Sequence, residues 1–189
     1  METLRGSITA VGFASGDRFV VGSWRTSPIG PFADVMWAQP DGSRVLLAPA
    51  HAADYITSVY PFEQVRHGVV EVSALRRRWE VRTAELVLSL QVGWAGVNLP
   101  PRPRRVTATV ENWCARALLG VRTYGVSPTG VAEWYRTQRV VRVVQASAQL
   151  SGRDLGPLTR VTRPLGFGFT DPPQHPTHTT LRVDLRRPD

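Results

Sequence analysis

The chain contains no lysine. All 23 residues counted as lysine or arginine are arginines, and the formal net charge at pH 7 is +8. Without an ε-amino group the protein cannot form a lysine Schiff base, attach pyridoxal phosphate through a lysine or supply a Walker-A lysine. The sequence therefore excludes these classes of enzyme before any motif is considered.

Cysteine and long apolar runs are also scarce. Cys114 is the single cysteine, so no internal disulfide can form, which is typical of a reducing compartment. No apolar run reaches the roughly 18 residues of a membrane span, and the opening METLRGSITAVGFASGDR lacks the apolar stretch of an export signal. We expect one cytoplasmic, β-rich domain over residues 1–189, because a chain of this length can bury a single core.

The arginines allow two interpretations. Arginine presents a planar fork that suits phosphate and stacks on bases, which would indicate a nucleic-acid partner. Alternatively, the codon usage of a GC-rich genome replaces lysine with arginine throughout. The arginines are scattered along the chain and not confined to one tail, which favours the second interpretation.

Strand patterns dominate the sequence. Residues 179–187, 85–92 and 76–82 alternate apolar and polar side chains with a period of two. The parity changes between the last two segments, so we expect a bulge or turn near Thr83. The pattern predicts further strands at residues 18–24, 32–38, 44–48, 68–75, 105–110 and 139–150.

Helices are expected to be few and short. Ala52, Tyr55, Ile56 and Val59 recur at helical spacing between prolines 49 and 61, and a second short helix is expected at residues 112–119. The turn at residues 40–43 makes residues 32–48 a hairpin. The fold class is therefore mainly β, α+β at the margin: a single antiparallel barrel or sandwich of about nine strands.

A Ser-Pro-x-Gly turn occurs twice, at residues 27–30 and 127–130. Each copy is soon followed by a carboxylate and a tryptophan, Asp34 with Trp37 and Glu133 with Trp134. A duplicated half-barrel would place the two carboxylates in related positions. The alternative is that Ser-Pro-x-Gly is simply a favoured turn sequence.

Asp34 and Glu133 are the candidate catalytic groups. Asp34 interrupts an apolar strand and shares a face with Phe32 and Met36. A carboxylate among apolar groups has a raised pKa, which suits a general acid or base near neutrality. The alternative is that both carboxylates point to solvent or pair with arginines.

Other residues offer weaker candidates. Cys114 would be a nucleophile only beside a histidine, and we expect the histidines at 51, 67, 175 and 178 on the surface. We therefore expect no metal site and no cofactor. The best nucleic-acid candidate is the basic charge beside Trp79, which comes from Arg76, Arg77, Arg78 and Arg82 with Arg102, Arg104 and Arg105. Successive strand residues point to opposite faces, however, which divides this cluster between the two faces.

Residues 27–32, Ser-Pro-Ile-Gly-Pro-Phe, with the strand at 44–48 and the helix at 52–60 resemble the front of acetoacetate decarboxylase-like β-barrel proteins. The resemblance covers about a quarter of the chain and implies a barrel or cone whose apolar interior holds a small carboxylate or polyketide-like molecule. The family's decarboxylases use a Schiff-base lysine, which is absent here, and an arginine where this chain has Ile29; the nearby Arg25 does not match the motif. The resemblance therefore implies the fold and not the reaction.

The leading hypothesis is a small-molecule pocket inside the barrel, with aromatic walls and an arginine that fixes a carboxylate-bearing or apolar metabolite. An arginine-rich module for nucleic acid, and a cofactor-free acid/base enzyme that uses Asp34 or Glu133, remain as alternatives. We expect no membrane partner, and oligomeric state is left open. The expected ligand-binding residues lie near the two Ser-Pro-x-Gly turns: Trp24, Arg25, Trp37, Arg122, Tyr124 and Trp134.

Overall fold

The computed structural model describes residues 1–99, 123–162 and 164–188. The described residues form one helix, α1 (Ala50–Thr57), and a sheet of 13 strands. The strands are β1 (Glu2–Phe13), β2 (Arg18–Thr26), β3 (Phe32–Ala38), β4 (Arg44–Ala48), β5 (Gln64–His67), β6 (Glu71–Leu75), β7 (Arg78–Arg82), β8 (Leu86–Asn98), β9 (Tyr124–Val126), β10 (Ala132–Leu150), β11 (Arg153–Asp154), β12 (Leu158–Thr159) and β13 (Thr177–Arg186).

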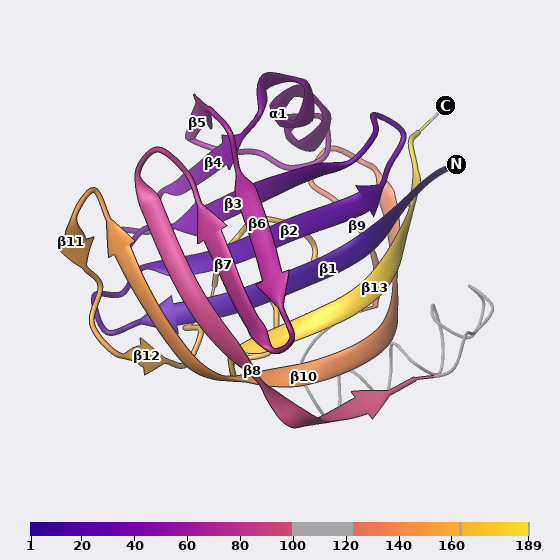
Figure 1. The fold of residues 1–189 in the computed structure, drawn as a ribbon. Helices are drawn as coiled ribbons and strands as arrows, with labels where there is room; N and C mark the ends of the chain where they lie inside the picture. Colours follow the sequence, from indigo (N-terminus) through magenta and orange to yellow (C-terminus); the bar gives the residue numbers. More distant parts are fainter. Residues whose placement is uncertain (100–122, 163, 189) are drawn as a thin grey trace.

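The sheet curls into an open half-barrel (Figure 1). Its strand order is β5-β4-β3-β2-β1-β13-β10-β8-β7-β6, while β9 and β11 pair with β10 and β12 pairs with β1. Among the described strands every pair is antiparallel except β4 with β5, which is parallel. The expectation of a mainly β fold with a short helix is confirmed, with the differences that the barrel is open and that one pair is parallel.

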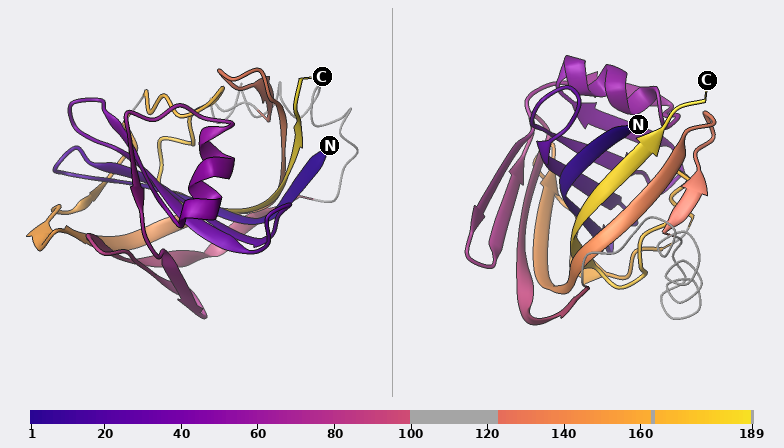
Figure 2. Two further views of the ribbon diagram at one scale, coloured as in Figure 1. Left: turned by 90° about the horizontal axis from the view of Figure 1, so that it is seen from above. Right: turned by 90° about the vertical axis from the view of Figure 1, so that its right-hand side faces the viewer.

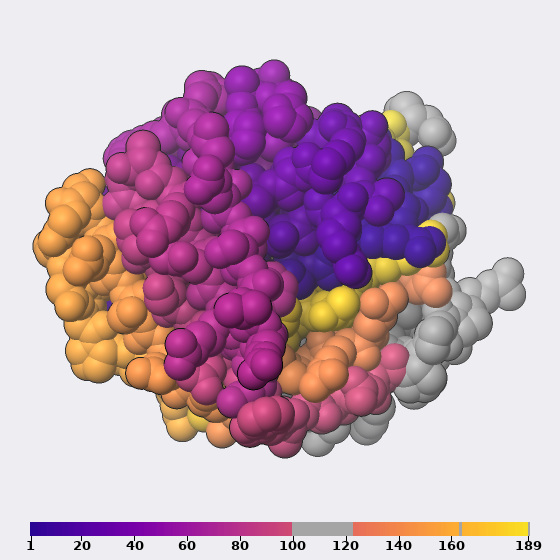
Figure 3. Space-filling view, in the orientation of Figure 1, coloured from indigo at the N-terminus to yellow at the C-terminus, as the bar shows by residue number. Residues whose placement is uncertain are grey.

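The sheet buries both of its faces. On β3 the side chains of Val35 and Trp37 enter one core, while those of Phe32 and Met36 pack on the opposite face. The first core fills the space between β1–β4 and the arm formed by β6, β7 and β8, with Val81 and Leu88 contributed by the arm. Figure 3 shows this arm lying over one face of the molecule beside β1–β3.

The other face is covered by α1 and by the segment that precedes β13. Helix α1 buries Ala52, Ala53 and Ile56 in the same apolar cluster as Leu46 of β4 and Leu181 of β13. Figure 2 shows α1 and residues 164–173 on one side of the sheet and the β6–β7 hairpin on the other. Of the described helices none is long and apolar enough to cross a membrane.

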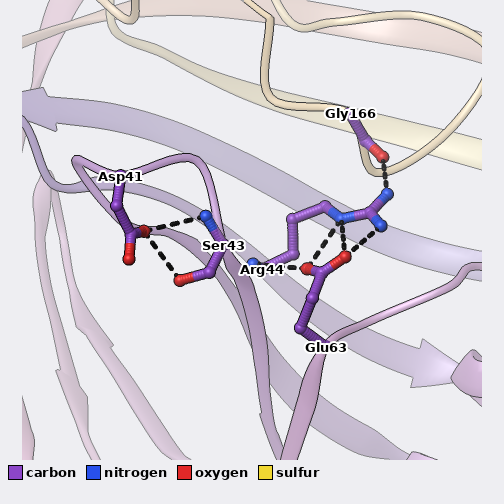
Figure 4. Close-up of polar contacts among 5 residues, drawn as sticks. All are labelled: Asp41, Ser43, Arg44, Glu63 and Gly166. Carbon is purple, nitrogen blue, oxygen red and sulfur yellow. Dashed lines mark hydrogen bonds and ion pairs between the residues drawn. The ribbon is translucent and has the colours of Figure 1, made fainter.

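Two arginines attach this covering segment to the sheet. Arg44 at the start of β4 forms an ion pair with Glu63 and donates a hydrogen bond to the Gly166 carbonyl (Figure 4). Hydrogen bonds from Arg44 hold the pKa of the Glu63 carboxyl down at about 2. Arg18 is buried and donates to the carbonyl oxygens of Gln39, Thr162 and Pro164 at 2.6, 3.3 and 3.3 Å.

Most strands follow the sequence pattern. The strands at 32–38 and 44–48 have the predicted bounds, and the chain turns at Thr83, whose hydroxyl accepts from the Glu85 and Leu86 amides. The hairpin turn before Arg44 closes through Asp41, which accepts hydrogen bonds from the Ser43 amide and hydroxyl (Figure 4). The strand expected at 105–110 and the helix expected at 112–119 lie outside the described residues.

The expectation that all four histidines lie on the surface is wrong for His178. Strand alternation places His178 on the face that β7 covers, where its ring packs on Trp79 with centroids 4.3 Å apart. Its Nδ1 lies 2.8 Å from the Thr9 hydroxyl. Burial lowers the pKa of His178 to about 4, so this histidine is neutral in the folded protein.

We predict that Arg18→Leu lowers the free energy of unfolding by about 3 kcal/mol, because three carbonyl oxygens lose a charged donor in a buried place. Arg25→Leu is the matched control on the same strand, since Arg25 is exposed and should change the value by less than about 0.5 kcal/mol. Urea titration followed by tryptophan fluorescence measures both. Equal losses in the two variants would contradict the role of Arg18 as a clamp.

Candidate functional site

A cavity of about 540 Å³ lies between the sheet and its covering segments. Its floor comes from β1, β2, β3, β10 and β13, and its cover from α1 and from residues 167–173. The volume is within the range of small-molecule sites. Most of the lining is apolar, including Leu4, Ile8, Val20, Phe32, Met36, Val140, Phe167, Leu181, Val183 and Leu185.

Asp34 projects from β3 into this apolar lining. Its side chain is 2% exposed, and its Oδ1 accepts a hydrogen bond from the Trp24 indole at 3.1 Å. Gly22 faces Asp34 across the β2–β3 ladder. A Cβ at position 22 would lie 2.3 Å from Asp34 Oδ1 and 2.7 Å from the indole nitrogen. The absence of a side chain at position 22 therefore makes the Trp24–Asp34 hydrogen bond possible.

A second polar group is built from Tyr60, Glu133 and Tyr135. The two phenolic oxygens lie 2.8 Å apart, the Tyr135 hydroxyl lies 3.0 Å from Glu133 Oε2, and the Tyr60 hydroxyl makes a short hydrogen bond to the same carboxylate oxygen. Glu133 and Tyr135 are two residues apart on β10 and so share a face. Tyr60 comes from the turn after α1, where its amide donates to the Ile56 carbonyl at 2.9 Å. Both tyrosines line the cavity.

Burial dominates the electrostatics of both carboxyl groups. Desolvation raises the pKa of Asp34 to about 7 against the opposing hydrogen bond from Trp24. Desolvation likewise raises the pKa of Glu133 to about 7, although the hydrogen bonds from Tyr60 and Tyr135 act in the opposite direction. Glu133 is completely buried, and its Oε1 has no hydrogen-bond partner within the described chain. Near neutral pH a large fraction of both groups is therefore protonated.

The described lining holds no positive charge. Its ionisable side chains are Asp34, Asp171, Tyr55, Tyr60 and Tyr135, and none of the described lining residues is an arginine or a histidine. Asp171 is engaged by the Leu165 amide at 3.0 Å. The site can therefore offer hydrogen bonds to a ligand, but these residues offer no counter-charge for an anion.

The structure brings together some of the residues that the sequence singled out. Trp24 and Asp34 line the cavity, and Glu133 lies on the same side of the sheet behind its two tyrosines. Both Ser-Pro-x-Gly turns form, with hydrogen bonds from Gly30 to Ser27 and from Gly130 to Ser127. Each turn leads into the strand that carries the carboxylate, as the repeated sequence suggested.

The other expected ligand-binding residues lie elsewhere. Trp37 points into the opposite core, where its indole donates to Asp17 at 2.8 Å. Arg25 is exposed, and Tyr124 and Trp134 pack against each other outside the lining, with ring centroids 5.0 Å apart and planes tilted by 36°. Arg122 lies outside the described residues.

The site also contains residues that the sequence analysis missed. Tyr60 and Tyr135 are the main ones, and Tyr135 could have been found because it follows Glu133 at the spacing of one strand face. Tyr60 gave no such signal, since its contact with Glu133 joins residues 73 positions apart.

Among the described residues, neither the metal candidates nor the nucleic-acid candidates come together to form a site. No group of three potential metal ligands comes together there, and Cys114 lies outside them. Arg76 sits in a turn with φ 57°, while Arg77 stacks over the exposed Trp94 at 3.6 Å. Arg102, Arg104 and Arg105 also lie outside the described part of the chain.

Comparison with known proteins finds weak similarity to solved structures. The sequence matches no protein-family model and no curated protein. The structure is similar to the crystal structure of acetoacetate decarboxylase from Legionella pneumophila subsp. pneumophila str. Philadelphia 1, with a TM-score of 0.49 and 7% identity over 96% of this chain and 83% of that chain. A structure from structural studies of acetoacetate decarboxylase gives a TM-score of 0.43 and 8% identity over 98% and 86%. Both matched structures are named as acetoacetate decarboxylase, the family whose members the Ser27–Phe32 turn resembles, and they assign no residue a role.

Proposed function

We propose that the protein binds a small, uncharged and mainly apolar molecule in the cavity between the sheet and α1. The observation that carries this proposal is the composition of the lining, which is apolar apart from a few polar groups on its walls. Such a composition is typical of a ligand pocket, where burial supplies affinity and a few polar groups fix orientation. The cavity volume of about 540 Å³ lies within the range of small-molecule sites.

Charge decides between the ligand classes that the sequence left open. A carboxylate-bearing ligand would lose its hydration and find no arginine among the described lining residues, while Asp34 and Asp171 would repel it. An uncharged ligand avoids this cost. The Tyr60 and Tyr135 hydroxyls can hydrogen-bond a carbonyl or hydroxyl oxygen on it, and Trp24 and Phe32 provide aromatic surface.

We predict that the neutral fluorophore N-phenylnaphthylamine binds at least tenfold more tightly than its sulfonated analogue anilinonaphthalene sulfonate, a difference of about 1.4 kcal/mol. The two probes share one aromatic skeleton and differ in the anionic group. Fluorescence titration gives both Kd values. Tighter binding of the sulfonate would contradict an uncharged ligand class.

A substitution that fills the cavity with a larger side chain tests whether the probe binds there. Ile8→Trp should weaken N-phenylnaphthylamine binding at least tenfold, because the indole occupies the cavity floor. Ile29→Trp is the matched control, since Ile29 lies in an exposed turn outside the lining. Circular dichroism confirms that both variants are folded. If both substitutions weaken the probe equally, the probe binds elsewhere.

Burial of the two carboxyls also predicts a pH dependence of stability. Their pKa values of about 7 in the folded protein exceed the ordinary values of 3.8 and 4.5, so the folded state holds more protons than the unfolded chain in this window. Stability from each group is complete below its ordinary pKa and is lost as the pH rises to about 7. The loss between pH 5 and pH 7 is about 2 to 3 kcal/mol per carboxyl, at 1.36 kcal/mol per pH unit.

The measurement is the free energy of unfolding in urea at several values between pH 5 and pH 8. Asp34→Asn and Glu133→Gln should each remove one of the two losses. His178, whose pKa is lowered to about 4, acts in the opposite direction, so the quantity compared is the change in slope from wild type to variant. Parallel curves for all three proteins would show that neither carboxyl is protonated in the folded state.

A further inference from the structure

The number of protons in the Tyr60–Tyr135–Glu133 cluster follows from its geometry. Three oxygens, the two phenolic ones and Glu133 Oε2, lie within hydrogen-bond distance of one another. The two phenols supply two protons, which can fill two of the three contacts. The third contact is a hydrogen bond only when Glu133 itself carries a proton. A closed ring of three hydrogen bonds therefore corresponds to a neutral glutamic acid.

The free oxygen of Glu133 supports the same protonation state. Oε1 is buried and has no partner within the described chain. As the carbonyl oxygen of a neutral acid it carries little charge, whereas as half of a carboxylate it would hold part of a negative charge with no donor. In the closed ring all three protons are used within the cluster. A ligand oxygen can receive the Tyr135 proton when the Tyr135–Glu133 contact opens, which at 3.0 Å is the longest of the three. The hydrogen bonds from Glu133 to Tyr60 and from Tyr60 to Tyr135 then remain, and the cluster donates without becoming charged.

The hydrogen bond to Asp34 favours the opposite protonation state. Its hydrogen-bond partner, the Trp24 indole, has an N–H that can only donate. This contact favours the ionised carboxylate, because an N–H bonds more strongly to a charged oxygen than to the carbonyl oxygen of a neutral acid. We therefore assign Asp34 as the proton acceptor and Glu133 as the carboxyl group that stays protonated.

Both groups face the same cavity. Asp34, Tyr60 and Tyr135 all line the cavity. The pKa of Tyr135 is raised well above its ordinary value chiefly by burial, and the charge of Asp34 also raises it. A molecule in the cavity would therefore be exposed to both the Asp34 carboxyl group and the tyrosine cluster.

We infer that this cavity catalyses proton transfer on an uncharged ketone that can enolise, with Asp34 as the base, Tyr135 as the donor to the carbonyl oxygen and Tyr60 as the donor to Tyr135. The inference rests on the proposed binding of an uncharged molecule and adds its chemical class. Glu133 is a positioning residue, since it acts through the two tyrosines. Apolar surroundings and preorganised donors are the conditions under which such a site stabilises an enolate.

The reaction balances without a cofactor. The Asp34 carboxylate takes the proton from the carbon next to the carbonyl, and the electron pair of that C–H bond forms a C=C bond. The C=O π electrons move to oxygen, where the Tyr135 hydroxyl stabilises the charge. Asp34 then returns its proton to the same carbon, or to a conjugated carbon two positions further along. The first outcome exchanges hydrogen, and the second isomerises a double bond.

The test uses β-tetralone, a neutral bicyclic ketone with exchangeable hydrogens, and follows their replacement in D2O by proton NMR. Wild-type protein should accelerate exchange above the buffer rate. Asp34→Asn should reduce the protein-dependent rate at least 100-fold, the usual contribution of a general base. Tyr135→Phe should reduce it by about 100-fold, as expected for loss of one donor to the developing oxyanion. Arg25→Leu, at an exposed position outside the lining, should keep the wild-type rate.

The positioning role of Glu133 is tested by the pH profile. The rate should rise with pH as Asp34 ionises and fall as the Glu133 proton is lost. Glu133→Gln should abolish the falling limb, because an amide donates at every pH, and a merely structural role would not change the shape of the profile. The other titratable groups on the lining are Tyr55, which donates to Glu2, and Asp171, which accepts from the Leu165 amide.

Binding of β-naphthol, a planar analogue of the enol, separates the outcomes. Binding in wild type and in Asp34→Asn, with exchange lost in the variant, supports the inference. Binding without exchange above the buffer rate, or with equal exchange in wild type and Asp34→Asn, overturns the inference and leaves the proposed function intact. Failure of both β-naphthol and N-phenylnaphthylamine to bind overturns the proposed function and the inference with it.

Discussion

The register of β1, β2 and β3 is the constraint on which the rest of the structure depends. Because these strands bury both faces, successive residues belong to different environments: Asp34 faces the cavity, while its neighbour Val35 faces the core under the β6–β8 arm. A slip of one residue would exchange the two and bury a carboxylate among aliphatic side chains. The cavity, its cover and the second core are therefore fixed together by one pattern of strand pairing.

The sequence predicts much of this fold because the information is local. Alternation over 32–38 and 44–48 is strong, and proline and glycine mark the turns. The long strand β1 was not predicted, because Gly6, Ala10 and Gly12 interrupt its alternation of apolar and polar side chains. Its glycines are required by residues distant in the sequence: a Cβ on Gly6 would lie 2.0 Å from the Ser23 carbonyl oxygen. The need for such close approach appears only when the strands are paired.

The site was predictable in part for the same reason. Asp34 and Glu133 stood out because each is a charge among apolar or aromatic residues, and both are buried. Trp37 was expected beside Asp34, yet the two differ by an odd number of positions, so a strand must send them to opposite faces. Tyr60 reaches Glu133 from the turn after α1, and no periodicity within either segment encodes that meeting.

The absence of a side chain at Gly22 makes three positions on two strands depend on one another: Gly22 and Trp24 on β2, and Asp34 on β3. The space it leaves is occupied by the Asp34 carboxylate and the Trp24 indole, so no change at any of the three is independent of the other two. Among homologues, position 22 should remain glycine wherever the acid and the tryptophan occur together, and it should be free to vary only where one of them is lost. Coordinated substitution at these positions would thus mark, from sequence alone, which relatives have kept the buried carboxylate.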